Sequence, residues 1–288
     1  MKEYRAVKIT AALAALLSVI ALLSVIVFIF IESWPFLSEK GIISLLKPGK
    51  WSPLSKNGSF SIFNMITASL YIFVIAIIIA LPVSVGTALF ISFYCPQRLK
   101  DILLRTVGIL AGVPSIVMGF IGLTVVVKLI EKGFNMATGE SVLAGGIVVS
   151  MMIIPFILSA VAESAEIIRK NHMRDSLFLG ISKEYFIRNV AAKELLKPVG
   201  IGVILAFSRV IGETMAIMMV VGNAPLFPKL LGKAETIPGL IALEMGMAEV
   251  GSIHYSALFS AGFVLLIVIT AVNLLIQFLR DRGLKNEN

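Results

Sequence analysis

The chain has 288 residues, 58% of them hydrophobic, and a mean hydropathy of +0.98. This composition is typical of a polytopic membrane protein and excludes an ordinary soluble domain. The net charge of +8 does not indicate nucleic-acid binding, because the basic residues flank apolar segments. The one cysteine, Cys95, cannot form an internal disulfide, and we interpret it as a buried, inert thiol.

Six apolar segments are long enough to cross about 30 Å of hydrocarbon. The first resembles the apolar core of a signal peptide, but it is longer and no small-residue cleavage site follows it, so we expect a retained helix. With the amino terminus inside, sixteen Lys and Arg residues fall in cytoplasmic stretches and eight in external ones. This bias predicts that both termini are cytoplasmic. The predicted spans are 9–31, 64–91, 105–127, 142–162, 198–222 and 256–279.

Prolines and glycines interrupt several spans. Pro82 is expected to kink the second span, and Pro155 is expected to break the fourth. The third span carries glycines at spacings that let helices approach closely, and we interpret them as packing positions. They are Gly108, Gly112, Gly119 and Gly122.

The fifth predicted span carries an arginine and a glutamate, Arg209 and Glu213, four residues apart. In a helix, side chains at this spacing lie on one face, a turn apart. An arginine at the bilayer centre costs about 3 kcal/mol on insertion scales, so such residues normally face a bundle interior or a water path. A guanidinium is a planar fork of donors that suits oxyanions. The pair therefore indicates passage of an anion, with a purely structural ion pair between helices as the alternative.

The segment 163–197, between the fourth and fifth spans, mixes charged and apolar residues. Leu177, Ile181 and Tyr185 recur at helical spacing, with Gly180 and Ser182 between them. We predict short amphipathic helices separated by a turn. A charged loop of this size favours docking to a cytoplasmic protein, with a solvated linker or a helix on anionic lipid as alternatives.

The external stretches carry weaker signals. Trp34 and Trp51 lie near apolar boundaries and are expected at the level of the lipid headgroups. The stretch after Asn223 is rich in proline, glycine and leucine, and parts of it are apolar enough to lie at the interface or to re-enter the membrane. Asn273, in the last span, requires a polar partner inside the bundle.

Motifs for catalysis are missing from the sequence. There is no GxxxxGK[ST] phosphate loop, no GxGxxG context, no HExxH pair and no plausible Ser/His/Asp set. His172 and His254 are far apart and lack the spacing of metal ligands. We therefore expect no catalytic residue, no metal and no cofactor on this chain. Energy for work against a gradient must come from a partner or from ion coupling.

The run S-R-V-I-G-E-T-M-A, from Ser208 to Ala216 and continuing to Gly222-Asn223, closely resembles the signature of phosphate-specific ABC importer permeases, a binding-protein-dependent transport permease family. It is similar to the C-type permeases (PstC) rather than to the paralogous A-type (PstA). Weaker matches lie at 81–86, 90–92, 112–119 and 251–258, so the resemblance covers roughly 60–279.

The resemblance implies an all-α membrane protein with six transmembrane helices and the architecture of an ABC importer type I permease. It implies an N-terminal helix and external loop over 1–63, a permease domain over 64–280 with a coupling loop at 163–197, and a cytoplasmic tail over 281–288. The implied partners are a PstA-type permease, an ATPase dimer that binds Mg-ATP, an external phosphate-binding protein and membrane lipid, in a prokaryotic inner membrane.

The resemblance also implies roles for named residues. Gly180 matches the glycine of the family's E-A-A-x-x-x-G coupling motif, but residues 174–176 replace its E-A-A. The ATPase-docking role is therefore carried over to the loop as a whole and not to any acidic residue in it. The expected substrate path contains Ser208, Arg209, Glu213, Thr214 and Asn223. The expected coupling loop contains Arg174, Asp175, Ser176, Gly180, Ile181 and Tyr185.

Three other functions remain open. A permease for another oxyanion, such as molybdate or sulfate, is disfavoured by the G-E-T-M-A run. An ion-coupled secondary carrier would transport alone in proteoliposomes, but the chain lacks an obvious inverted repeat and such a carrier leaves the loop 163–197 without a role. A scaffold or sensor would carry the intramembrane Arg–Glu pair as an unneeded cost.

Overall fold

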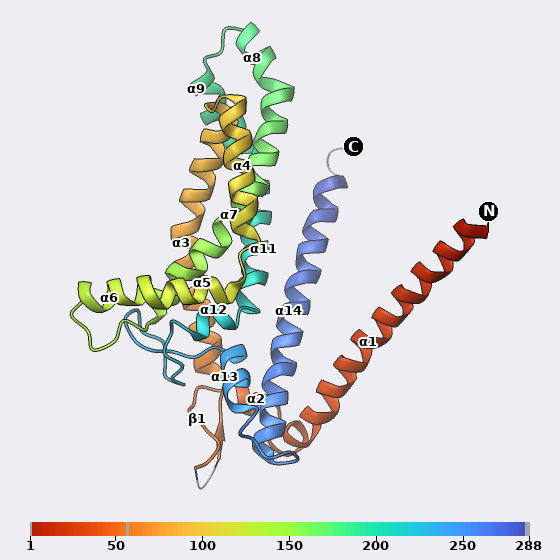
Figure 1. Cartoon of the computed structure of the whole chain (residues 1–288), viewed down its shortest axis with the longest axis vertical. Helices are drawn as coiled ribbons and strands as arrows, with labels where there is room; N and C mark the ends of the chain where they lie inside the picture. Colours follow the sequence, from red (N-terminus) through yellow and green to blue (C-terminus); the bar gives the residue numbers. More distant parts are fainter. Residues whose placement is uncertain (1, 56–57, 286–288) are drawn as a thin grey trace. The chain divides into compact units, whose positions relative to one another are not determined.

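The computed structural model describes residues 2–55 and 58–285, most of which are helical (Figure 1). Residues 286–288 of the expected tail lie outside this part of the chain. The chain forms two compact units. One contains Met1–Ile62 and Leu240–Ile267, and the other contains Phe63–Gly239 and Val268–Asn288.

The first unit combines helices with a short hairpin. Gly41, at φ +72°, separates α1 (Lys2–Lys40) from α2 (Ile42–Leu46). Strands β1 (Trp51–Ser52) and β2 (Ser59–Phe60) pair antiparallel, with Trp51 opposite Phe60. Most of α13 (Ile237–Glu244) and the first half of α14 (Ile253–Lys285) complete the unit.

Trp51 is buried among protein side chains in this unit, so its expected role as a lipid-facing anchor is wrong. Its ring packs edge-on against Phe60. Its indole Nε1 donates to Glu244 Oε2 at 2.8 Å, and His254 Nε2 lies 2.8 Å from the same oxygen. The hydrogen bond to a carboxylate satisfies the only polar atom of the indole, so the ring is buried without an unpaired N–H. Trp34, by contrast, is exposed.

The second unit is centred on two parallel helices, α3 (Phe63–Phe93) and α7 (Val142–Ile168). Small residues at all but one of the buried every-fourth positions of α3 let the two backbones approach closely. Ser84 and Ser92 donate their hydroxyls to the carbonyls of Ile154 and Ala162 on α7, at 3.2 and 3.3 Å. The buried seam of α3 consists of Ala68, Ile72, Ala76, Ala80, Ser84 and Ala88.

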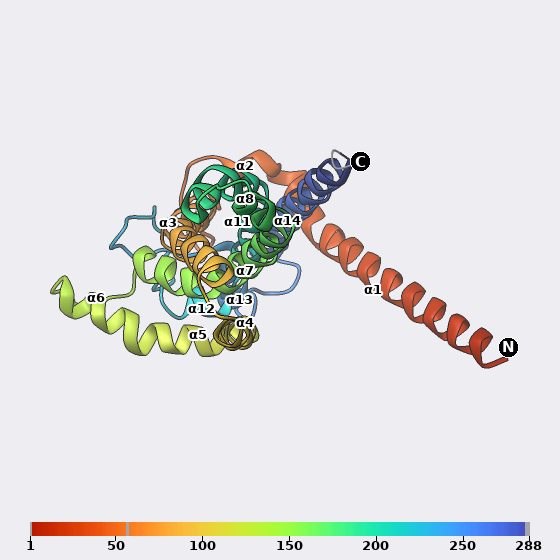
Figure 2. The same ribbon diagram turned by 90° about the horizontal axis from the view of Figure 1, so that it is seen from above.

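The third predicted span is not one straight helix. Helix α4 (Gln97–Ala111) ends at Gly112, and α5 (Ser115–Ile121) continues through η1 (Gly122–Val126) into α6 (Val127–Gly133). The two parts meet at 94°, so α5 and α6 run crosswise to α3 and α7 (Figures 1 and 2). Pro114 causes the bend, because it lacks an N–H and disfavours a helical conformation in the residue before it.

Four helices of the described chain are long and apolar enough to cross a membrane, or five if the bent pair counts as one span. They contain most or all of the predicted spans 9–31, 64–91, 142–162 and 256–279. The expected break at Pro155 is wrong, since α7 is continuous. The fifth predicted span is divided into α11 (Leu196–Ile211) and the short α12 (Met215–Met218).

The loop 163–197 is helical, as the periodicity predicts. Helix α8 and helix α9 are separated by a turn at Gly180, which has φ +74°. The hydroxyl of Ser182 caps α9 by accepting from Tyr185 N at 3.3 Å. The elements are η2 (Arg169–Met173), α8 (Arg174–Phe178), α9 (Lys183–Phe186), η3 (Ile187–Ala191) and α10 (Ala192–Glu194).

The stretch after Asn223 folds onto the start of α7. The amides of Val142 and Leu143 donate to the carbonyls of Gly232 and Leu230 at 3.0 and 2.9 Å. These contacts satisfy N–H groups that have no partner within a helix. The stretch therefore caps α7 through its backbone.

Candidate functional site

The candidate site lies at the break between α11 and α12. Gly212 follows the last residue of α11, and the chain restarts as a helix at Met215. The carboxylate of Glu213 accepts a hydrogen bond from Ala216 N at 3.2 Å. This acceptor satisfies one of the free N–H groups at the start of α12, so Glu213 stabilises the restart of the helix.

Arg209 and Glu213 form the ion pair that their spacing predicts. Arg209 Nη1 lies 3.1 Å from Glu213 Oε2. The Glu213 side chain is 4% exposed, whereas that of Arg209 is 43% exposed. A buried carboxylate requires a charge partner and hydrogen bonds, and Glu213 has both. A guanidinium has five N–H donors, and among the described residues Glu213 is the one ion-pair partner of Arg209.

Close packing against α5 fixes the position of α12, because a Cβ at Gly119 would lie 2.8 Å from Ala216 Cα. A Cβ at Gly122, in η1, would lie 2.4 Å from Val148 Cγ2 on α7 and 2.9 Å from Val220 Cγ1, which follows α12. The interpretation of these two glycines as packing positions is therefore confirmed. Gly108 differs, because a Cβ there would meet nothing within 4 Å among the described residues.

Ser208 and Asn273 meet beside the pair. The Ser208 hydroxyl donates to Asn273 Oδ1 at 3.4 Å, which gives Asn273 the polar partner that its place in the last span requires. Asn273 was not among the expected path residues. The only sequence signal for it is a polar side chain in an apolar span.

Thr214 and Asn223 lie on either side of α12. Thr214 is half-buried and makes no side-chain capping bond. Asn223 has φ +44°, and its Nδ2 donates to the Met218 carbonyl at 2.8 Å. Its Oδ1 is buried and has no hydrogen-bond partner among the described residues. The amide donor of Asn223 is thus engaged by the backbone, and the roles of both residues in the substrate path stay predictions.

The expected coupling residues surround the α8–α9 turn. The Ser176 hydroxyl donates to His172 O at 2.8 Å, and Ile181 N donates to Ser176 O at 3.0 Å. Arg174 lies over the Phe178 ring, 5.6 Å from its centroid. The other three expected residues, Asp175, Gly180 and Tyr185, are exposed.

Two apolar residues at this turn were not predicted. Phe178 and Leu179 are both strongly exposed, directly before Gly180. Their sequence signal is an apolar pair next to a turn glycine. Phe186, the last residue of α9, is buried against Phe93 of α3. This contact anchors the turn to the helical bundle.

The exposed guanidinium of Arg209 suits the binding of an anion. Among the described residues there is no group of three or more His, Cys, Asp and Glu side chains that could hold a metal ion. The charged pair lies at a break between two helices, where backbone N–H groups lack intrahelical partners.

The chain belongs to the family of binding-protein-dependent transport system inner membrane components, whose profile matches residues 80–285. It is thus a transport permease subunit rather than an enzyme, and a multi-pass inner membrane protein.

Individual relatives match most of the chain. It is 31% identical over 271 residues to the probable ABC transporter permease protein YqgH of Bacillus subtilis, covering 93% of this chain and 88% of the relative. It is 30% identical over 267 residues to the probable phosphate transport system permease protein PstC of Methanocaldococcus jannaschii, covering 86% and 84%. It is 30% identical over 275 residues to the phosphate transport system permease protein PstC of Mesorhizobium japonicum, covering 88% and 83%.

Proposed function

We propose that this chain is the PstC-type permease subunit of an ATP-driven phosphate importer and forms half of the translocation path. The observation that carries the proposal is the half-exposed guanidinium of Arg209, held at a helix break by a buried carboxylate. An anion that crosses a bilayer needs a cationic donor group within the membrane, and a planar fork of donors matches a phosphate. The PstC names of several relatives support phosphate as this anion.

The pair would also make substrate binding weak. Glu213 occupies part of the Arg209 fork, so an entering anion competes with a carboxylate that is already in place. A transport site must bind strongly enough to admit its substrate and weakly enough to release it. Ser208, Thr214 and Asn223 would line the same path.

The assembly would consist of this chain, a paralogous PstA-type permease, an ATPase dimer and an external phosphate-binding protein. Six crossings result when the bent pair α4–α5 and the broken pair α11–α12 each count as one. The excess of Lys and Arg in the stretch 163–197 and near both ends of the chain would place these parts in the cytoplasm. Mg-ATP would be bound and hydrolysed by the partner ATPase.

Coupling would occur through the α8–α9 turn. Its exposed Phe178 and Leu179 form an apolar tip that suits a groove on a partner protein, while Phe186 fixes the turn to α3. ATP-driven closure of the ATPase pair would move this turn, and α11 would shift Arg209 between outward and inward exposure.

Two variants that differ in their expected effect on ATPase binding test the proposal in cells and in the purified complex. Arg209→Ala should abolish uptake of labelled phosphate and leave co-purification of the ATPase intact. Phe178→Asp should abolish both, because a charge at the apolar tip opposes docking. Phe178 is exposed, so its substitution should not disturb folding.

Each alternative has a distinct outcome. Normal phosphate uptake by Arg209→Ala would end the proposal. Recovery of transport by the double variant Arg209→Glu/Glu213→Arg would show that the pair is structural. Stronger inhibition of uptake by molybdate or sulfate than by phosphate would indicate a different oxyanion.

A further inference from the structure

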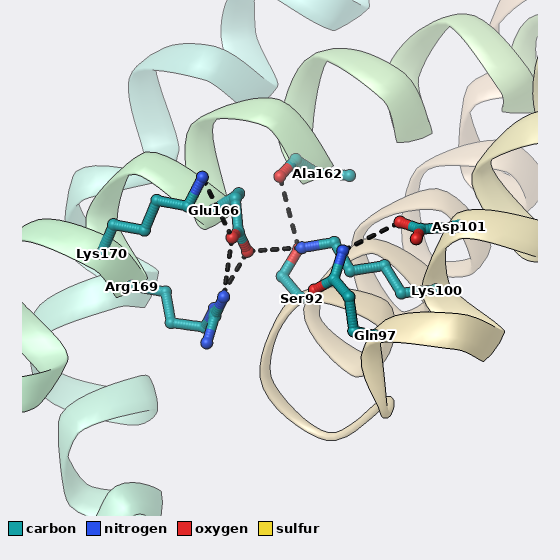
Figure 3. A network of polar contacts seen from close by, with 8 residues as sticks. All are labelled: Ser92, Gln97, Lys100, Asp101, Ala162, Glu166, Arg169 and Lys170. Atoms are coloured by element: carbon teal, nitrogen blue, oxygen red, sulfur yellow. Dashed lines mark hydrogen bonds and ion pairs between the residues drawn. The ribbon is translucent and has the colours of Figure 1, made fainter.

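A second charged cluster joins α4 to the end of α7, in a region without a role in the proposed path (Figure 3). The carboxylate of Glu166 accepts from Arg169 twice, through Nε at 2.9 Å and Nη2 at 2.7 Å. Lys100, on α4, forms an ion pair with the same carboxylate. Lys170 Nζ lies 3.6 Å from Glu166 Oε1.

Positive charge is in excess in this cluster. Three cations surround Glu166, and the one further carboxylate that lines the adjacent cleft, Glu163, is exposed. The hydrogen bond from Arg169 is the main reason that the pKa of Glu166 falls from 4.5 to about 2, against the effect of burial, and Lys100 lowers it further. Glu166 therefore stays ionised at neutral pH and still leaves the cluster with net positive charge.

Lys100 has fewer partners than its burial requires. The residue is only 6% exposed. An ammonium group has three N–H donors, and the described residues supply one hydrogen-bond acceptor for this one, Glu166 Oε2. A buried charged group is stable when its donors are filled, so Lys100 favours an additional anionic oxygen nearby.

A cleft next to Lys100 has room for such a group. Its volume is about 480 Å³, and it lies between α4 and α7. Leu104, Ala162 and Ile167 give it apolar walls. Lys100 and Lys170 contribute cationic groups, while of the two lining carboxylates Glu166 is already paired with these cations and Glu163 is exposed. A ligand that suits this lining has an anionic head and an apolar tail.

The cleft also lies at the depth where a lipid headgroup is expected. The helical run Val142–Phe178 has 37 residues, or about 55 Å at 1.5 Å per residue, which exceeds a hydrocarbon core of about 30 Å. Residues 142–162 are uncharged, whereas four of the eight residues in 163–170 are charged. The cluster is therefore placed where α7 leaves the hydrocarbon.

We infer that the cleft between α4 and α7 binds an anionic phospholipid, whose headgroup phosphate contacts Lys100 and Lys170 and whose acyl chains lie against Leu104 and Ile167. Basic pockets between membrane helices near the headgroup region recognise lipid phosphates in this way. The inference does not depend on which anion the protein transports.

Native mass spectrometry of the full chain, purified in detergent and titrated with phosphatidylglycerol or phosphatidylcholine, tests the inference. One phosphatidylglycerol should bind at least tenfold more tightly than phosphatidylcholine. Lys170→Gln should weaken this binding severalfold, and Lys100→Gln should weaken it further. Lys100→Arg should retain it, and Glu163→Gln should tighten it by removing a nearby negative charge.

Lys128→Gln is the matched control. Lys128 is 59% exposed and pairs with Glu131 on its own helix, much as the 68% exposed Lys170 pairs with Glu166. This control should bind phosphatidylglycerol as the unmodified chain does. Equal binding of both lipids, or unchanged binding in a monodisperse Lys170→Gln preparation, would overturn the inference. Displacement of phosphatidylglycerol by millimolar inorganic phosphate would also overturn it, because the occupant would then be free phosphate.

Discussion

The contact between α5 and α12 gives a quantitative test of the fold around the candidate site. A Cβ at Gly119 would lie 2.8 Å from Ala216 Cα, 2.9 Å from Met219 Sδ and 3.3 Å from Ala216 O. Two of these atoms belong to the backbone and cannot rotate away. Gly119→Ala must therefore push α12 away from α5.

Two opposing effects set the magnitude. Replacing glycine by alanine inside a helix stabilises it by up to about 1 kcal/mol. Forcing an extra carbon into a close-packed contact costs about 1–3 kcal/mol. We expect the second effect to dominate, with a net loss of about 1–2 kcal/mol. At about 2–4 °C per kcal/mol for a chain of this size class, the melting temperature should fall by about 2–8 °C.

Thermal unfolding of the full chain in detergent, followed by circular dichroism, measures this shift. Gly108→Ala is the matched control, since it lies in α4 and its new Cβ would meet nothing within 4 Å among the described residues. Its melting temperature should be unchanged or higher. If Gly119→Ala proved as stable as this control, the close approach of α5 to α12 would be refuted.

Two further predictions concern stability. Trp51→Phe removes the indole donor to Glu244 and should lower the free energy of unfolding by about 1.5–3 kcal/mol. Trp34→Phe, at an exposed position, should leave the melting temperature unchanged. Equal effects of the two substitutions would contradict the buried role of Trp51. The pKa of Glu166 is about 2 in the folded chain, below its ordinary value of 4.5. Its contribution to stability is therefore fully present above about pH 4.5 and is lost as the pH falls toward 2. Between pH 5 and pH 3 the melting temperature should fall more steeply in the unmodified chain than in Glu166→Gln, and parallel profiles would exclude this linkage.

Local spacing predicted the features that depend on neighbouring residues. A separation of four positions places Arg209 and Glu213 about one helical turn apart, and the two side chains do form a pair although α11 ends at Ile211. The alternation of apolar residues with Gly180 and Ser182 predicted two short helices and a turn, which the structure contains. Long apolar runs in the sequence located four long helices, because length and apolar composition are the two properties that a membrane span requires.

Breaks in helices depend on more than the breaking residue. Pro82 and Pro155 lie inside the continuous helices α3 and α7, which pack against each other and so tolerate a missing backbone hydrogen bond. Pro114 follows Gly112-Val113 and coincides with a bend of 94°. Hydropathy averages do not distinguish these cases. Trp51 was misplaced for a related reason, since its partner Glu244 is 193 residues away in the sequence.

The break at Gly212 gives the two members of the charged pair unequal roles. Glu213 is buried, binds the amide of Ala216 and forms an ion pair with Arg209, so its carboxylate stabilises the local structure. Arg209 is half-exposed, and Glu213 leaves most of its donors free. A continuous helix would have no free amide at Ala216 for a carboxylate to satisfy. The break therefore gives the buried carboxylate of Glu213 a structural role, and in the proposed path the remaining N–H donors of Arg209 would contact the passing anion.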